Sequence, residues 1–218
     1  GNSAFGQGGY PGGGGGGGIY CDSSNPILTN VKILNNMASS GAGMCCYSSN
    51  PILEDVLIDG NGCAINNYSK GGGISMYEST PSLKNVIISN NYVTGEWSFG
   101  GGISFSFGSN ASLEDVYILE DVYILNNSSE FSGGGMQVAS KNLTLKNVII
   151  ALNSVSGGYG GGGINILGSD LKLENVTISY NSSLGYGSGI HSFNSTISIV
   201  NSILWNELQN EIYFSSET

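Results

Sequence analysis

Short apolar clusters, separated by glycine and asparagine, recur along the whole chain in one fixed order. One phrase reads LKNVIISNN at residues 83–91, and close variants begin at Leu28, Leu53, Leu119, Leu145 and Leu173. A second phrase of the GGGI type alternates with it, and its anchoring apolar residues are Ile19, Met44, Ile74, Ile103, Met136, Ile164 and Ile190. The anchors lie 25 to 33 residues apart. This variable spacing indicates short fixed strands joined by loops of different length.

Each repeat unit contains about three strand-sized pieces in which side chains alternate between two faces. In the first piece, Ile74 and Met76 are predicted to point inward and Ser75 outward. The predicted inward columns of the first strand are Ile19, Met44, Ile74, Ile103, Met136, Ile164 and Ile190, then Cys21, Cys46, Met76, Phe105, Val138, Ile166 and Ser192. The second strand is predicted to contribute Leu28, Leu53, Leu83, Leu113, Leu145 and Leu173. The third is predicted to contribute Val31, Val56, Val86, Val122, Val148 and Val176, then Ile33, Ile58, Ile88, Ile124, Ile150 and Ile178.

One unit cannot bury these faces alone, so the units must stack. The pattern predicts an all-β parallel solenoid of about seven coils, each built from three short strands. Coils about 4.8 Å apart would make a rod about 35 Å long. We expect a Gly-rich segment at residues 1–18, the solenoid at 19–214 and a short tail at 215–218.

An asparagine closes most of the repeated phrases at the same point. A buried amide must be hydrogen-bonded, or it costs about 1–3 kcal/mol. We therefore predict an inward ladder at a turn, in which each side chain bonds to the next coil, formed by Asn36, Asn61, Asn91, Asn127, Asn153 and Asn181. A second ladder is predicted at the corner before the third strand, formed by Asn30, Asp55, Asn85, Asp121, Asn147, Asn175 and Asn201. The glycines are predicted to give the corner before the first strand its freedom in φ.

The segment LEDVYILEDVYI, residues 113–124, is a tandem duplication of six residues. Only one copy can fill the inner columns in register. The other must loop out or form a local extra strand. We predict an irregular bulge near 113–124.

Composition limits the partners of the chain. It has 218 residues with 36 Gly, 10% charged residues, a net charge of -10, six Lys and no Arg. This balance argues against nucleic acid and against anionic membrane surfaces, both of which attract Lys and Arg. No apolar run reaches about 18 residues, so we expect no membrane insertion. The first residues lack the pattern of a signal peptide, so we expect either a removed leader or a fragment of a longer chain.

The two phrases resemble the repeats of polymorphic outer-membrane proteins. In that family a GGA[IL]-type phrase alternates with FxxN; residues 71–74 match the first and 88–91 the second, with Ile in place of Phe. The phrase at 201–214 is similar to the closing coil of choice-of-anchor bacterial surface proteins. The resemblance covers about residues 12–214 and implies a right-handed parallel β-helix at the cell surface or outside the cell. It carries over no catalytic residue.

Candidate catalytic and metal-binding residues fit structural roles better. The acidic pairs Glu54-Asp55, Glu114-Asp115 and Glu120-Asp121 belong to the repeated phrase, with each Glu expected to point outward. Asp59-Gly60-Asn61 resembles part of a calcium loop but lacks its later ligands. His191 is the only histidine and is expected to lie on the outer face. We therefore expect no catalytic site, no metal and no cofactor.

The four cysteines leave two interpretations open. Cys21 and Cys46 share an inward column in consecutive coils, at a spacing that suits a disulfide. Stacked free thiols that behave as small apolar residues suit the same positions. Cys45 is expected to face outward, and Cys63 lies far round the coil.

The outer face of the first strand is expected to be flat, small and polar, formed by Tyr20, Cys45, Ser75, Ser104, Gln137, Asn165 and His191. The adjoining loops carry aromatic residues at Tyr68, Tyr92, Trp97, Phe99, Phe131, Tyr159 and Tyr186. These either cover the Gly-rich corners or contact sugars and proteins. We expect a non-catalytic structural or adhesive protein, which self-associates through its coil ends into filaments or binds surface glycans or proteins. The alternative is a carbohydrate-binding or carbohydrate-active β-helix protein.

Overall fold

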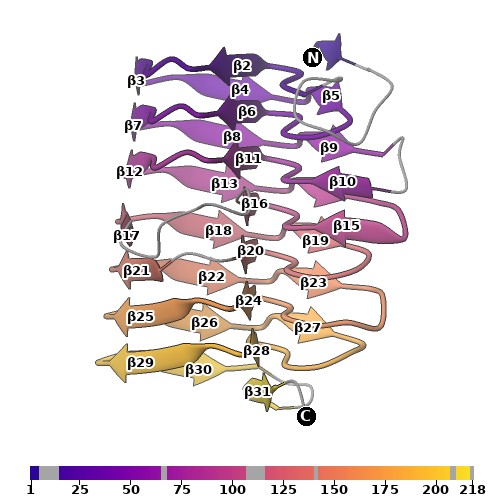
Figure 1. The fold of residues 1–218 in the computed structure, drawn as a ribbon, viewed down its shortest axis with the longest axis vertical. Helices are drawn as coiled ribbons and strands as arrows, with labels where there is room; N and C mark the ends of the chain where they lie inside the picture. The colour runs from indigo at the N-terminus through magenta and orange to yellow at the C-terminus, as the bar shows by residue number, and fades with distance from the viewer. Residues whose placement is uncertain (5–14, 65–67, 107–115, 140–141, 207–209, 217–218) are drawn as a thin grey trace.

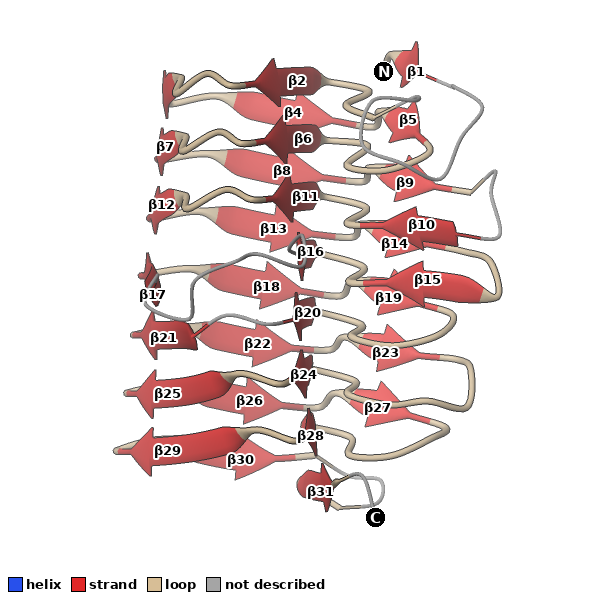
Figure 2. Ribbon diagram, viewed as in Figure 1, coloured by secondary structure: helices blue, strands red, loops and turns tan. Residues whose placement is uncertain are grey.

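The computed structural model of the protein is a rod of stacked coils built from β-strands and loops (Figures 1 and 2). It describes residues 1–4, 15–64, 68–106, 116–139, 142–206 and 210–216, and these contain no helix. The strands form five sheets, here called sheets A to E, of seven, two, eight, seven and seven strands. All strand pairs are parallel. For example, Ile74 pairs with Met44 of the preceding coil and with Ile103 of the following coil. The predicted parallel solenoid is confirmed.

Three long sheets run the length of the rod. Sheet C contains β2 (Ile19–Asp22), β6 (Met44–Tyr47), β11 (Ile74–Tyr77), β16 (Ile103–Ser106), β20 (Met136–Ala139), β24 (Ile164–Leu167), β28 (Ile190–Phe193) and β31 (Ile212–Ser215). Sheet D contains β3 (Ile27–Thr29), β7 (Ile52–Glu54), β12 (Ser82–Lys84), β17 (Val116–Glu120), β21 (Asn142–Lys146), β25 (Asp170–Glu174) and β29 (Thr196–Val200). Sheet E contains β4 (Lys32–Leu34), β8 (Leu57–Asp59), β13 (Ile87–Ser89), β18 (Tyr123–Leu125), β22 (Ile149–Ala151), β26 (Thr177–Ser179) and β30 (Ile203–Trp205). The seven strands in each of sheets D and E are joined by about six full turns of the chain.

A fourth, short strand follows sheet E in most coils and was not predicted. These strands form sheet A, with β1 (Ser3–Ala4), β5 (Met37–Ala38), β9 (Gly62–Cys63), β14 (Tyr92–Val93), β19 (Ser128–Ser129), β23 (Ser154–Val155) and β27 (Ser182–Ser183). Two coils add sheet B, with β10 (Tyr68–Lys70) and β15 (Trp97–Phe99). Strands of two residues such as Ser128–Ser129 carry no alternation that a sequence pattern could reveal.

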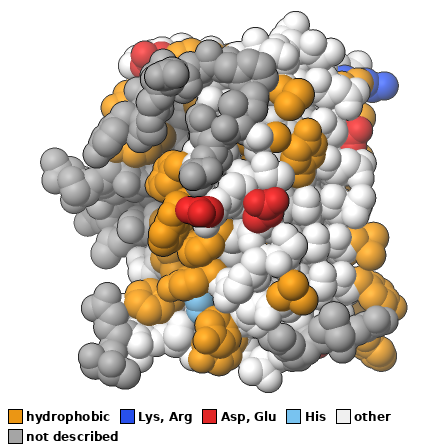
Figure 3. Space-filling view, turned by 90° about the vertical axis from the view of Figure 1, so that its right-hand side faces the viewer, with side chains coloured by type: hydrophobic (Ala, Val, Ile, Leu, Met, Phe, Trp, Pro, Cys, Tyr) orange, Lys and Arg blue, Asp and Glu red, His pale blue; other side chains and the backbone are white. Residues whose placement is uncertain are grey.

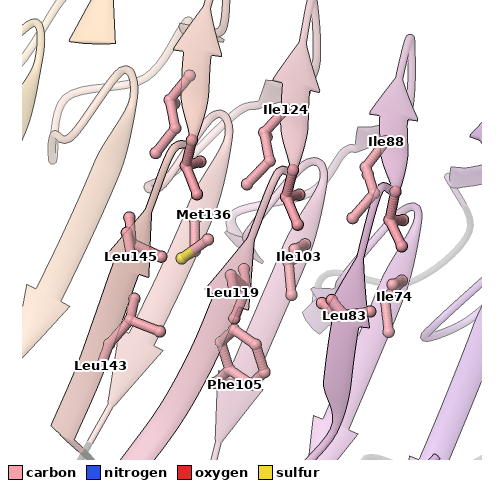
Figure 4. Close-up of a cluster of buried hydrophobic side chains, with 14 of the residues drawn as sticks. Ile74, Leu83, Ile88, Ile103, Phe105, Leu119, Ile124, Met136, Leu143 and Leu145 are labelled. Carbon is pink, nitrogen blue, oxygen red and sulfur yellow. The ribbon is translucent and has the colours of Figure 1, made fainter. Parts of the chain in front are cut away.

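The predicted inward columns form one continuous core. Ile74, Leu83 and Ile88 of one coil pack beside Ile103, Leu119 and Ile124 of the next (Figure 4). Their side chains are almost fully buried. Burial of one such side chain stabilises the fold by about 1.5–3 kcal/mol, so the stacked columns are its main source of stability.

One residue of the Leu column was predicted wrongly. Leu119, not Leu113, pairs with Leu83 and Leu145 and fills the column. The second copy of the duplication therefore supplies the core, because it is the copy joined directly to Val122 and Ile124. Residues 113–115 lie outside the described residues, whereas Val116–Glu120 form β17 and Tyr123–Leu125 form β18 with the ordinary corner between them, so the described part of the duplication contains no bulge.

Sheet D lengthens along the rod for a chemical reason. Its first three strands follow Pro26, Pro51 and Pro81 and are three residues long. Proline has no N–H to donate to the ladder of hydrogen bonds. The strands from β17 onward have five residues. The two additional residues bring a second side chain to the inner face, and this side chain is Leu143 in β21 and Leu171 in β25.

Left-handed backbone makes the corners. The first glycine of each GGG phrase has φ between 55° and 72°, as predicted, at Gly16, Gly41, Gly71, Gly100, Gly133, Gly161 and Gly187. The third glycine serves a different purpose, since a Cβ on Gly73 would lie 2.7 Å from the Gly102 carbonyl oxygen and 3.0 Å from Asn91 Nδ2. Glycine at this place lets neighbouring coils and the Asn side chains come together.

Both ends of the described chain join the solenoid. Ser3–Ala4 form β1 and pair with β5, although the first 18 residues were expected to precede the repeats. At the other end, β31 pairs with β28 as an additional strand of sheet C. Ser215, expected to begin the tail, is the last residue of that strand.

Candidate functional site

The structure places all six asparagines of the first predicted ladder inside the rod, where they are buried. Asn91 Oδ1 accepts hydrogen bonds from the backbone N–H and Nδ2 of Asn61 at 2.9 and 3.0 Å. Asn91 in turn donates from the same two groups to Asn127 Oδ1 at 2.9 and 3.0 Å. Its other amide proton goes to the Ile58 carbonyl at 3.0 Å. The amide is fully satisfied, so its role is structural.

The repeated sequence pattern did not predict that Asn206 is a seventh residue of the ladder or that Glu211 ends it. Asn181 donates to Asn206 Oδ1 at 2.7 and 3.0 Å, from its backbone N–H and Nδ2. Asn206 then donates from the same two groups to the two carboxylate oxygens of Glu211, at 2.7 and 2.6 Å. The carboxylate thus stands where the next asparagine would be. Asn206 was missed because it directly follows β30, without the corner residue that precedes the other rungs.

That corner residue, and not the ladder asparagine, has the left-handed backbone. The residues before the first six rungs have φ between 53° and 67°, namely Asn35, Gly60, Asn90, Asn126, Leu152 and Tyr180. Asparagine and glycine suit this conformation, whereas leucine and tyrosine are strained by it.

The second predicted ladder is a corner column and not a continuous ladder. Its seven residues lie before sheet E, are exposed and have φ between 50° and 57°. Asn85 Nδ2 donates to Asp55 Oδ1, and Asn175 Nδ2 donates to Asn147 Oδ1 at 3.3 Å. These residues were selected for the left-handed corner, and their exposed side chains are free to bond to water at the other coils.

The outer face of sheet C is not the exposed polar face that was expected. Ser75, Ser104, Gln137, Asn165 and His191 are all buried there. Segments between sheets A and C contact the last of them: Ser132 Oγ donates to Gln137 Oε1 at 2.9 Å, and the rings of Tyr159 and Tyr186 lie 5.5 and 5.9 Å from His191. Cys45 is half-buried at the same face, and Tyr20 at its end is exposed.

A hydrogen-bonded chain satisfies the last of these side chains. Asn165 Nδ2 donates to Gln137 Oε1 at 2.7 Å, which leaves Asn165 Oδ1 facing His191 Nδ1 at 2.8 Å. His191 Nδ1 therefore carries a proton, and Nε2 lies 3.0 Å from Ser215 Oγ on β31. Burial lowers the pKa of His191 below its usual value. The histidine ties β31 to the coils before it.

Aromatic rings from successive coils, carried on sheet B, on β31 and on the segments between sheets A and C, form a row that reaches His191. Adjacent ring centroids are 4.5–5.9 Å apart in the pairs Tyr68–Phe99, Trp97–Phe131, Phe99–Phe131, Phe131–Tyr159, Tyr159–His191, Tyr186–His191 and Tyr186–Tyr213. We call Tyr68, Trp97, Phe99, Phe131, Tyr159, Tyr186 and Tyr213 the aromatic strip. Figure 3 shows hydrophobic side chains gathered along this side of the rod, with the histidine beside them.

The aromatic strip does more than cover the corners, because much of it stays exposed. Tyr68, Trp97, Tyr159 and Tyr186 keep 47%, 51%, 39% and 48% of their surface accessible. Tyr92, predicted with them, lies instead in sheet A and is half-buried. Rows of exposed Tyr and Trp are typical of protein interfaces.

All four cysteines are free. Cys21 and Cys46 are paired neighbours in sheet C, so they are stacked thiols in this structure. Burial raises the pKa of Cys21 and Cys46, and it raises the pKa of Cys45 and of Cys63 to about 12. Thiols with such pKa values are poor nucleophiles.

Two of the acidic pairs, Glu54-Asp55 and Glu120-Asp121, lie at the end of a sheet D strand and at the corner that follows it, whereas Glu114-Asp115 lies outside the described residues. Register places Glu54, Lys84, Glu120, Lys146 and Glu174 side by side in successive coils, with alternating charge. Lys84 Nζ is 3.7 Å from Glu54 Oε1. Opposite charges on neighbouring strands stabilise a sheet by about 0.2–1 kcal/mol per pair. We call these five residues the charge column.

The calcium-like fragment is also part of the framework. Asp59 Oδ1 accepts hydrogen bonds from Ser89 Oγ at 2.7 Å and from Asn90 Nδ2 at 2.6 Å. Among the described residues no three His, Cys, Asp or Glu side chains are grouped as metal ligands. The described residues contain no helix, and so none that is long and apolar enough to cross a membrane.

Comparison with known proteins identifies the fold. The family model described as "Right handed beta helix region" matches residues 17–218. The finer resemblance to polymorphic outer-membrane and choice-of-anchor proteins stays an expectation. No curated protein matches the chain.

Among solved structures, the chain is similar to QnrB1, a plasmid-mediated fluoroquinolone resistance protein. The two share 10% identity and a TM-score of 0.22, over 90% of this chain and 91% of the other. A superposition this poor carries no argument about function.

Proposed function

The chain belongs to the family of right-handed β-helix proteins, and from this premise we propose that it is a non-catalytic structural and adhesive protein of the cell surface or extracellular space. The observation that carries the proposal is the aromatic strip. It offers half-exposed Tyr and Trp side chains along one side of a rigid scaffold. A partner that lies along the rod would meet several rings at once.

The strip is preorganised for binding. Ring–ring contacts, such as Phe131–Tyr159 at 5.0 Å, hold the side chains in place before any partner arrives. Binding then costs little side-chain entropy. Tyr and Trp are also the residues that most often dominate interface energies.

The remaining chemistry supports a role without catalysis. The asparagines are hydrogen-bonded in the ladder, Asp59 is bonded to its neighbours, and the Glu residues of the charge column alternate with Lys. These side chains contact neighbouring coils and so have structural roles. A surface glycan or a surface protein is the partner class that we propose, with location outside the cell resting on the resemblance of the repeats.

Binding to immobilised glycans and to whole cells tests the proposal. We expect the wild-type protein to bind a surface component, and Trp97→Ala to weaken this binding at least tenfold, which is typical of an aromatic anchor. Tyr180→Ala is the matched control, because Tyr180 is 54% exposed but lies outside the strip. Equal loss in both variants, or no binding by the wild type, would overturn the adhesive role.

A further inference from the structure

Self-association through the coil ends meets an obstacle at the C-terminal end. There β31 already occupies the edge of sheet C, and the Glu211 carboxylate takes both donors of the last ladder residue. A second copy stacked on this end would have to pair with β31 and not with β28, and the Asn206 donors that would meet its first ladder residue are already bonded. Association that avoids this end needs another surface.

The outer face of sheet E is such a surface. One outward column along it is formed by Lys32, Leu57, Ile87, Tyr123, Ile149, Thr177 and Ile203, which register places side by side. A second column is formed by Leu34, Asp59, Ser89, Leu125, Ala151, Ser179 and Trp205. We call these the large column and the small column. Ile87, Tyr123, Ile203 and Trp205 are exposed.

This face carries few charges. Lys32 and Asp59 are its only charged residues, and both lie in the first two coils. From β13 to β30 the two columns have no charge at all, in a chain whose net charge is -10. Two copies that meet along this stretch bring no like charges of the two columns together.

The two columns are complementary in size in two of the middle coils, whereas Tyr123 and Leu125 in the coil between them are both large. In the two complementary coils the large column presents Ile87 and Ile149, and the small column presents Ser89 and Ala151 at the same levels. A two-fold axis parallel to the rod would set the large column of one copy over the small column of the other. It would also bring Lys32 of one copy within one coil of Asp59 of the other, with opposite charges.

We propose that sheet E is a self-association surface, and that its occupant is a second copy of this chain packed face to face in this way. The contact area available on sheet E indicates how stable the dimer is. Seven strands spaced by about 4.8 Å, with two columns about 7 Å apart, give a core contact of only a few hundred Å². This is less than the roughly 800 Å² per partner of a standard interface, so the dimer is weak and depends on concentration.

Sedimentation velocity over a wide concentration range tests the proposal. The average mass of the wild type rises from the monomer toward the dimer with concentration, and rises more at high salt, because salt screens the net negative charge. Ile87→Lys prevents this. Ser82→Lys, the matched substitution on the outward face of sheet D in the same coil, leaves it unchanged.

Thr177→Lys is a second variant of sheet E that separates loss of dimerisation from misfolding. Thr177 is a half-buried polar residue in the large column, and its replacement removes no core contact. It should weaken dimerisation at least tenfold while the thermal melting curve stays that of the wild type. A wild type that remains monomeric up to millimolar concentration would overturn the proposal. So would dimerisation that survives both sheet E variants, or that Ser82→Lys abolishes equally.

Discussion

Individual residues in this protein are selected mainly by backbone conformation and by contact with the same residue one coil away. Asn occurs at the corners because it tolerates φ near 55°, and it occurs in the ladder because its amide both donates and accepts. Leu152 and Tyr180 have φ of 61° and 54° without either advantage. At these two corners the sequence has neither the Asn nor the Gly that the other corners before the ladder have.

Leu152→Asn should stabilise the protein for this reason. An ordinary side chain in left-handed backbone costs about 1–2 kcal/mol, and Asn recovers part of it. The Leu152 side chain is 57% exposed, so little packing is lost. We expect the free energy of unfolding in urea to rise by about 0.5–1 kcal/mol.

Leu184→Asn is the control, since Leu184 is 73% exposed and is not among the residues with positive φ. It should leave the urea midpoint unchanged. If Leu152→Asn unfolds at the same urea concentration as the wild type, corner strain is not the cost we ascribe to it.

At the scale of elements, the strands that pack the core were predictable and the short ones were not. Inward positions such as Ile74, Leu83 and Ile88 follow from alternation, because one face of each strand is buried. Sheet A was missed because its two-residue strands show no alternation. The duplicated phrase allowed two registers, and sequence alone did not tell Leu113 from Leu119.

The candidate site was less predictable than the fold. Alternation correctly placed His191 and Asn165 on the outer face of sheet C, but it says nothing of loops that later cover that face. Burial of these residues depends on contacts between rings far apart in sequence, such as Tyr159 with His191 at 5.5 Å. The large and small columns of sheet E emerge only when the register of all seven strands is known.

The ladder behaves as one element, so its middle should matter more than its end. Asn91→Ala leaves the backbone N–H and one Nδ2 proton of Asn61 unpaired in the buried interior, whereas Asn127 Oδ1 keeps the hydrogen bond from the backbone N–H of residue 91. Each orphaned donor costs about 1–3 kcal/mol, so we expect a loss of at least about 2 kcal/mol. Asn36→Ala, at the first rung, should cost less than half as much in the same denaturant titration. Equal losses would show that the rungs act independently.

At the scale of the whole molecule, each coil contacts only its neighbours, so stability is a sum of local terms. Damage at one end should therefore stay there. Glu211→Ala removes both acceptors from Asn206 at the last rung. We expect faster hydrogen exchange in β28 and β30 and unchanged protection in β11 and β16.

Glu174→Ala serves as the control for that experiment, because it removes another carboxylate but leaves the ladder intact. Its exchange pattern should match the wild type at the last coil. A uniform increase along the whole rod in Glu211→Ala would mean that the coils unfold together.

The ladder also gives the rod an electrical direction. Every side-chain amide from Asn36 to Asn206 donates toward the following coil, so their dipoles point the same way and add along the axis. Glu211 places a negative charge against the donor end, as acidic residues do at the N-terminus of a helix. Reversing one amide would set two donors or two acceptors against each other on both sides of it. A coil inserted anywhere along the rod must therefore carry its asparagine in the same orientation, and a coil that does so extends the series without disturbing the others.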